Sequence, residues 1–184
     1  MKLPLLTPWQ VLERRQLVKR SFITLWEDRV RLPSGVEIDD FCVVESPDWA
    51  AVVCVTPERQ LVLVRQYRHG VKGPSLELPA GALEPAELPL AAAQRELAEE
   101  TGYESQSWQP LLQASLDPAR QSGQAHFFYA GDARPCRPQQ LDASEAIEIV
   151  LMSRQELLRA IEARELVHGI HIAAILMAEH RGLL

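Results

Sequence analysis

The sequence predicts a fold of the α+β class, with strands in its first third and helices further along. Three observations support this prediction. Residues 1–56 consist mainly of strand-like runs interrupted by turn residues. Residues 89–101 are rich in strong helix formers. The segment Ser153-Arg154-Gln155-Glu156 is a capping box, a pattern that opens a helix.

The N-terminal sequence predicts a β-hairpin in a segment that is separate from the main domain. The runs 21–32 and 36–45 flank Pro33-Ser34-Gly35, which is a turn signal. The segment Ser46-Pro47-Asp48 then breaks the strand pattern. We therefore expect two parts, an N-terminal antiparallel β extension over residues 1–46 and a main domain over residues 47–184.

Two apolar runs open the main domain. Residues 49–55 suit a buried strand, and residues 61–66 follow a turn at 56–60 as its partner. Residues 70–75 contain two glycines and a proline and predict a loop. Residues 76–81 predict a short strand that ends at Gly81.

A helix is predicted from Pro89 to the residue before Gly102. Proline suits the first helical turn, and glycine suits the position just after the last one. The elements after it are strands at 108–116, 125–130 and 146–152, a helix from Ser153 to about Val167, and a last helix at 170–180.

Composition excludes several classes of protein. The chain has 184 residues and a formal net charge of −6, so a broad basic surface for nucleic acid is not expected. No apolar run reaches the roughly 20 residues that span a bilayer, and the N-terminus does not resemble a signal peptide. The three cysteines, Cys42, Cys54 and Cys136, fit neither a disulfide framework nor a zinc site. We expect a reducing cytoplasm, with no membrane partner.

The excess negative charge lies in one segment. Residues 77–104 hold seven glutamates and one base, Arg95, whereas the rest of the chain is balanced. Glu96, Glu99 and Glu100 stand at i, i+3 and i+4 on the predicted helix and so share one face. Such a face can be merely solvated, but a hard divalent cation also suits clustered carboxylates.

The pattern around this helix resembles the Nudix box. Gly81 is followed after five residues by Glu87, and after seven more by the run 95–103, which reads R-E-L-A-E-E-T-G-Y. The resemblance implies a Nudix fold, a mixed β-sheet between helices in an α/β/α sandwich. It also implies that Gly81, Glu87, Arg95 and Gly102 have structural roles in the box.

The resemblance further implies a Mg²⁺ site, in which Mn²⁺ can substitute. By position, Glu96 and Glu100 are the primary ligands, and Glu99 binds directly or through water. The backbone carbonyl of Ala80 completes a site, and Glu99 and Glu100 count among the catalytic residues. The metal would act as Lewis acid and activate a water for attack on phosphorus.

Flanking segments are similar to the ADP-ribose pyrophosphatase group. These are residues 63–68 and 76–81 and the N-terminal turn at 32–35. The group implies diphosphate binding by Arg65 and, more favourably, Arg68, and nucleoside contacts by Trp26. A surface ion pair is the alternative for each arginine. Pro118 occupies a position typical of the ADP-ribose enzymes, but the glycines that usually follow it are missing.

The general base is expected outside the box. Related enzymes use a glutamate from a late loop, which favours Glu145, with Glu148 as second candidate and a solvated acid as the alternative. His126 is expected to be a packed histidine.

The expected activity is hydrolysis of the pyrophosphate bond of ADP-ribose or a similar nucleoside diphosphate sugar by a homodimer that does not bind nucleic acid. A GDP-sugar or a dinucleoside polyphosphate is the alternative substrate. A Nudix module that senses nucleotides without turnover is the alternative from another class.

Overall fold

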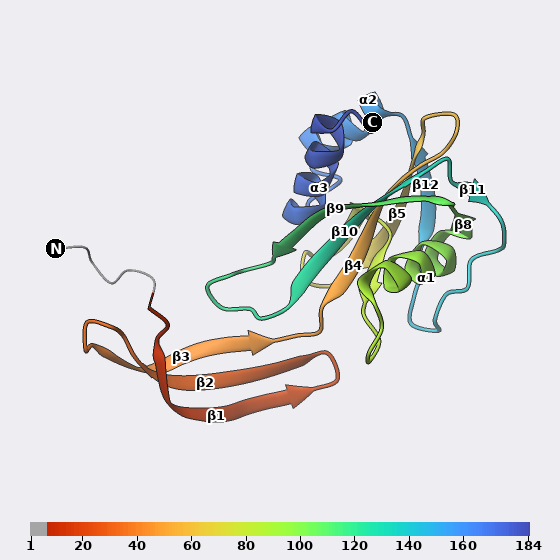
Figure 1. Cartoon of the computed structure of the whole chain (residues 1–184). Coiled ribbons are helices and arrows are strands. Elements are labelled where there is room, and N and C mark those ends of the chain that lie inside the picture. The colour runs from red at the N-terminus through yellow and green to blue at the C-terminus, as the bar shows by residue number, and fades with distance from the viewer. Residues whose placement is uncertain (1–6) are drawn as a thin grey trace. The chain divides into compact units, whose positions relative to one another are not determined.

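The computed structural model describes residues 7–184 and places twelve strands and three helices along them (Figure 1). The strands are β1 Gln10–Arg20, β2 Ile23–Arg31, β3 Glu37–Glu45, β4 Trp49–Val55, β5 Leu61–Arg68, β6 Gly73–Glu77, β7 Ala80–Ala82, β8 Tyr103–Glu104, β9 Ser107–Ser115, β10 Gln124–Gly131, β11 Arg134–Pro135 and β12 Glu148–Met152. The helices are α1 Pro89–Thr101, α2 Arg154–Glu162 and α3 Gly169–His180.

The contacts divide the chain into two compact units. One unit is Met1–Pro47 with Ser115–Gly123, described from residue 7 onward, and the other is Asp48–Ala114 with Gln124–Leu184. In the first unit, strands β1, β2 and β3 form an antiparallel sheet. This confirms the predicted hairpin of β2 and β3, which turns at Gly35 with φ +88°. The backbone of Val44 also bonds with Arg120 and Ser122 of the second segment.

The second unit contains a seven-stranded mixed sheet. Its main order is β12-β5-β4-β10-β9, with β6 paired to β5 and β7 paired to β4. Strands β4 and β10 are parallel, whereas β5 is antiparallel to β4, β6 and β12. The expected mixed sheet is therefore confirmed.

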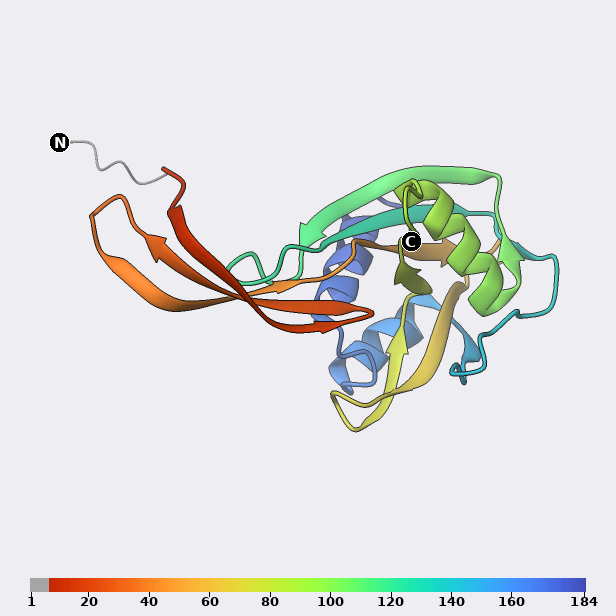
Figure 2. The same ribbon diagram turned by 90° about the horizontal axis from the view of Figure 1, so that it is seen from below.

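Helices cover both faces of this sheet (Figures 1 and 2). Because successive side chains of a strand point to opposite faces, β4 contributes to two cores. Ala51 and Val53 belong to the core that includes residues of α2 and α3, whereas Val52 and Cys54 pack with residues of α1. Burial on both faces explains why β4 reads as an uninterrupted apolar run.

Strands β4 and β5 pair only near their connecting turn. Cys54 and Val55 face Val62 and Leu61, and beyond this point β6 pairs with β5 and β7 pairs with β4. Residues 73–82 therefore line both inner edges where the two strands separate. The predicted loop at 70–75 is wrong in its last residues, because β6 begins at Gly73. The predicted strand at 76–81 is divided between β6 and β7.

The second helix is shorter than predicted. It begins with the expected capping box at Ser153, but it ends at Glu162 and not near Val167. The backbone leaves the helix through Arg164, which has φ +61°. This exit places Leu166, which is 1% exposed, in the core that includes residues of α2 and α3.

Candidate active site

Helix α1 carries the predicted carboxylates, and its two ends form as the sequence indicates. Pro89 lies in the first turn, and Gly102 ends the helix in the left-handed conformation with φ +71°. One face is buried through small and apolar residues, among them Ala92, Ala93 and Leu97. Burial of this face against the sheet fixes the helix.

Glu100 is a buried carboxylate. The residue is 4% exposed, and one carboxylate oxygen accepts a hydrogen bond of 2.9 Å from the backbone N–H of Ala80. Within residues 7–184 no salt bridge reaches it. Burial raises the pKa of Glu100 to about 8, despite the bond from Ala80. The ionised form therefore needs a positive partner.

Glu96 lies against the strand that opens the box. Its side chain is 12% exposed, and burial raises its pKa, although the Arg95 guanidinium opposes the rise. A Cβ atom added to Gly81 would overlap the Glu96 carboxylate. A side chain at position 81 would therefore displace the Glu96 carboxylate, because the backbone of β7 approaches it closely.

Arg95 binds several of the acids around it. Its guanidinium donates two hydrogen bonds of 2.9 Å to Glu87, and others to Glu96 at 2.7 Å and Glu99 at 3.1 Å. It also reaches the carbonyl oxygen of Ala82 at 3.1 Å. The contact with Glu87 ties the loop before α1 to the helix, and it lowers the pKa of Glu87.

The donor set fits a hard divalent cation. In the described part of the chain, no three Asp, Glu, His or Cys side chains converge on one point, since Glu96 and Glu99 turn toward Arg95. Glu96 and Glu100 nevertheless place a partly buried and a buried carboxylate one helical turn apart, and Glu100 lacks a salt bridge within residues 7–184. A cation that binds carboxylate oxygen would relieve both the repulsion and the burial penalty.

Arg65 and Arg68 lie on β5, and both make ion pairs. Arg68 donates two bonds, of 2.9 and 2.6 Å, to Glu77, whose side chain is 3% exposed. Burial alone would raise the pKa of Glu77, but the guanidinium holds it below its ordinary value. Arg65 makes longer contacts, of 3.4 and 3.3 Å, with the exposed Glu148 and Glu165.

These two arginines should differ in their effect on stability. We expect Arg68→Ala to lower the free energy of unfolding by about 2–3 kcal/mol, because it leaves the buried Glu77 carboxylate unpaired. Arg65→Ala is the matched control on the same strand, and it should change stability by less than about 0.5 kcal/mol. Urea denaturation of both variants at pH 7 checks this. Equal losses would contradict the structural difference between the two pairs.

The candidates for the general base lie on or near β12. Glu145 is exposed in the loop before this strand, where its carboxylate accepts a 2.9 Å bond from the backbone N–H of Asp142. Glu148 begins β12 and pairs with Arg65. His126 is partly buried on β10 and lies 3.3 Å from Asp48.

Trp26 belongs to the other compact unit. Its indole N–H donates a 2.7 Å bond to Glu45, and the guanidinium of Arg14 lies 5.4 Å from the ring centre. The ring is only partly buried, and these contacts hold it on the three-stranded sheet.

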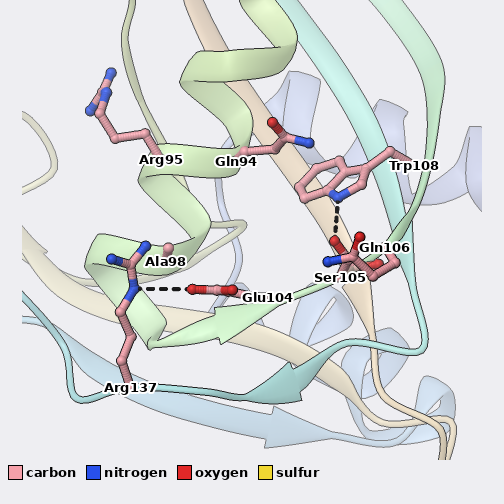
Figure 3. A pocket seen from close by; sticks show the side chains of 8 residues that line it. All are labelled: Gln94, Arg95, Ala98, Glu104, Ser105, Gln106, Trp108 and Arg137. Carbon is pink, nitrogen blue, oxygen red and sulfur yellow. Dashed lines mark hydrogen bonds and ion pairs between the residues drawn. The ribbon is translucent and has the colours of Figure 1, made fainter.

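A depression of about 440 Å³ lies on another flank of α1 (Figure 3). Gln94 and Ala98 line it, and each is two residues from Glu96 or Glu100, a rotation of about 200° on the helix. The depression is therefore distinct from the carboxylate face. Its lining is Gln94, Arg95, Ala98, Glu104, Ser105, Gln106, Trp108 and Arg137.

Two residues beside the site were not identified from the sequence. Glu77 could have been suspected, because it is a single acid between the apolar residues Leu76 and Leu78 of a predicted strand. Gln139 bonds to the end of α1 from a loop that shows no periodic pattern, so the sequence gives no signal for it.

Comparison with known proteins identifies the family of this chain. The family model described as the NUDIX domain matches residues 46–170. A second model, the nucleoside diphosphate sugar hydrolase N-terminal domain, matches residues 9–44. The chain therefore belongs to the Nudix family, and its activity class is that of a Nudix hydrolase.

Individual relatives cover most of the chain. A methanol dehydrogenase activator of Bacillus methanolicus is 29% identical over 90% of both chains. An ADP-ribose pyrophosphatase of Bacillus subtilis is 29% identical over 85% of this chain and 84% of its own. A crystal structure described as an ADP compounds hydrolase has a TM-score of 0.82 at 20% identity, covering 97% and 98% of the two chains. That likeness supports the Nudix fold.

No helix within residues 7–184 combines the length and apolar character needed to cross a membrane.

Proposed function

We propose that this chain is a Mg²⁺-dependent hydrolase that cleaves the pyrophosphate bond of ADP-ribose or a similar nucleoside diphosphate sugar. The products are a nucleoside monophosphate and a sugar phosphate. The observation that carries the proposal is the buried Glu100 carboxylate beside Glu96, within a complete Nudix box. The two family models, together with the names of the relatives, support the substrate class.

Each candidate residue has a distinct role in this proposal. Glu96 and Glu100 hold the cation, together with Glu99 and the carbonyl of Ala80. When bound, the cation supplies the Lewis acid and the activated water of metal-assisted displacement at phosphorus. Glu145 accepts the proton from the attacking water at its carboxylate.

Arg68 is the proposed diphosphate ligand. Glu77 accepts from its Nε and Nη2 atoms, which fixes the plane of the guanidinium and leaves its Nη1 side for a phosphate oxygen. Arg65 is a second, weaker candidate, because its contacts are longer and more exposed. Arg68 is thus preferred to Arg65 as the diphosphate ligand because its carboxylate partner is buried, whereas those of Arg65 are exposed.

The N-terminal unit is the proposed site of dimerisation, over residues 1–46, and of nucleoside contacts through Trp26. Its strands and turns expose several large apolar side chains, as dimer surfaces commonly do. These are Trp9, Val11, Leu17, Val18, Phe22, Ile23 and Val36. Light scattering should give twice the chain mass of 20.7 kDa, and a monomer at all working concentrations would contradict the proposal.

The assay that tests the function uses Mg²⁺ with ADP-ribose and separates the products by chromatography. We expect AMP and ribose 5-phosphate in equal amounts, and no turnover when a chelator replaces Mg²⁺. A GDP-sugar and a dinucleoside polyphosphate belong in the same panel, and faster cleavage of either would reassign the substrate. Tight binding without cleavage of any of the three would identify a sensing module instead. We also propose that the protein lies in the cytoplasm, and fractionation of whole cells tests this.

A further inference from the structure

The last turn of α1 is capped by a segment from elsewhere in the chain. The final carbonyls of a helix have no partner within the helix and need one outside it. Here the carbonyl of Glu99 accepts a 2.8 Å bond from the backbone N–H of Gln140. The carbonyl of Glu100 accepts a 2.6 Å bond from the side-chain amide of Gln139. Glu99 and Glu100, two of the proposed metal ligands, therefore also anchor residues 139–140 through their own backbone carbonyls.

Further contacts hold the same segment against the helix end. The carbonyl of Gly102 accepts from the backbone N–H groups of Cys136 at 2.9 Å and Arg137 at 3.3 Å. The Arg137 side chain lies 3.3 Å from the Glu104 carboxylate, and a dashed line in Figure 3 marks this ion pair. Residues 136–140 thus run along the end of α1. Their backbone N–H groups bond to the carbonyls of Glu99 and Gly102, and the Gln139 side chain bonds to that of Glu100.

Gln139 makes a second hydrogen bond, to a residue that follows Glu145 in the chain. Its amide nitrogen also donates to the carbonyl of Ile147 at 3.2 Å. Residues 140–147 consequently form a loop whose two ends are tied to the last turn of α1, one by the Gln140 backbone and the other by the Gln139 amide. Glu145 lies inside this loop and is exposed.

We propose that Gln139 is a positioning residue for hydrolysis, because its two hydrogen bonds join the carboxylate-bearing turn of α1 to the far end of the loop that carries Glu145. The inference rests on the proposed function, in which Glu145 takes the proton from water. With the far end of the loop untied, Glu145 would sample more positions and meet the water less often. A small misplacement of such a group can cost about 100-fold in rate.

The test compares Gln139→Glu with Gln140→Ala. Gln139→Glu keeps the size of the side chain but removes both donors, whereas Gln140→Ala keeps the backbone N–H that bonds to Glu99. We expect Gln139→Glu to lower kcat by about 10- to 100-fold, with KM and the Mg²⁺ concentration for half-activity changed less than about threefold. Gln140→Ala should match the wild type in all three quantities.

Amide hydrogen exchange separates positioning from general destabilisation. In Gln139→Glu, residues 141–147 should exchange faster, while the first turns of α1 exchange as in the wild type. The melting temperature should fall only slightly, because the substitution removes two hydrogen bonds at one end of the helix. A wild-type kcat in Gln139→Glu, or an equal fall in kcat, stability and Mg²⁺ affinity, would overturn the inference. The inference would also be overturned if Gln139→Glu lowered kcat while amide exchange in residues 141–147 stayed as in the wild type. A wild-type protein that hydrolyses no substrate in the panel would contradict the proposed function itself, and the positioning role with it.

Discussion

Glu100→Gln should abolish hydrolysis while the fold is retained. The substitution keeps the side-chain size and an oxygen that can accept from the Ala80 N–H, but it removes the buried negative charge that we propose holds the cation. We expect kcat to fall by about 1,000-fold or more, as for loss of a main electrostatic group in an active site. Steady-state kinetics with ADP-ribose and Mg²⁺ measure this.

Glu100→Gln should be more stable than the wild type without metal, and less stable than the wild type when Mg²⁺ is added. The pKa of Glu100 is about 8 in the folded protein and near 4.5 when unfolded. The unfolded state therefore ionises first as the pH rises, so the metal-free protein loses stability between about pH 4.5 and pH 8. Glu100→Gln lacks this loss, so without metal it should unfold at a higher temperature than the wild type at pH 8 and at a similar one at pH 4.5.

Added Mg²⁺ should stabilise the wild type and leave Glu100→Gln almost unchanged, because a ligand stabilises only the folded state that binds it. Glu84→Gln is the matched control, since Glu84 is an exposed acid of the same acidic segment and undergoes the same chemical change. It should behave as wild type in both assays. Full activity in Glu100→Gln, or equal Mg²⁺ stabilisation of all three proteins, would contradict the metal assignment.

Gly102→Ala should cause a large loss of stability, and Gly182→Ala should cause a small one. Both glycines follow a helix and have nearly the same backbone angle, with φ +71° and +69°. An alanine in this region costs about 1 kcal/mol at either position. At Gly102 the new Cβ would also overlap the backbone carbonyl oxygen of Arg137, whereas at Gly182 nothing lies within 4 Å.

The difference between the two variants measures the docking of residues 136–140 on α1. We expect Gly102→Ala to lower the free energy of unfolding by about 3 kcal/mol or more, since the overlap forces a backbone shift. It should also reduce kcat, because the displaced segment leads into the Glu145 loop. Urea denaturation and kinetics on both variants check this. Equal destabilisation at the two positions would show that backbone angle alone determines the requirement for Gly102.

The sequence predicted features that depend on local pattern. The helix limits at Pro89 and Gly102 and the hairpin around Gly35 follow from turn and cap residues a few positions apart. The grouping of Glu96, Glu99 and Glu100 follows from helical spacing. The separation of β4 from β5 was not predicted, because it depends on pairing with β6 and β7 and leaves no periodic signal within any one strand.

The local sequence pattern also did not show which charged side chains form ion pairs with one another. Arg95 is surrounded by carboxylates, and only the folded arrangement shows that it contacts Glu96 and Glu99 as well as Glu87. The pairing of Arg68 with Glu77 joins residues nine positions apart on neighbouring strands. Such pairs depend on strand register, which the sequence determines only through the whole sheet.

The separation of β4 and β5 has a consequence for aggregation. Val64–Arg68 of β5 and Trp49–Ala51 of β4 would each present an unpaired inner edge if residues 73–82 moved away, and both strands contain runs of fully buried apolar residues. Open edges of this kind pair readily with other chains. The segment that leads to Ala80 and Gly81 therefore also shields the sheet from intermolecular strand pairing. Substitutions that loosen it would lower solubility as well as activity.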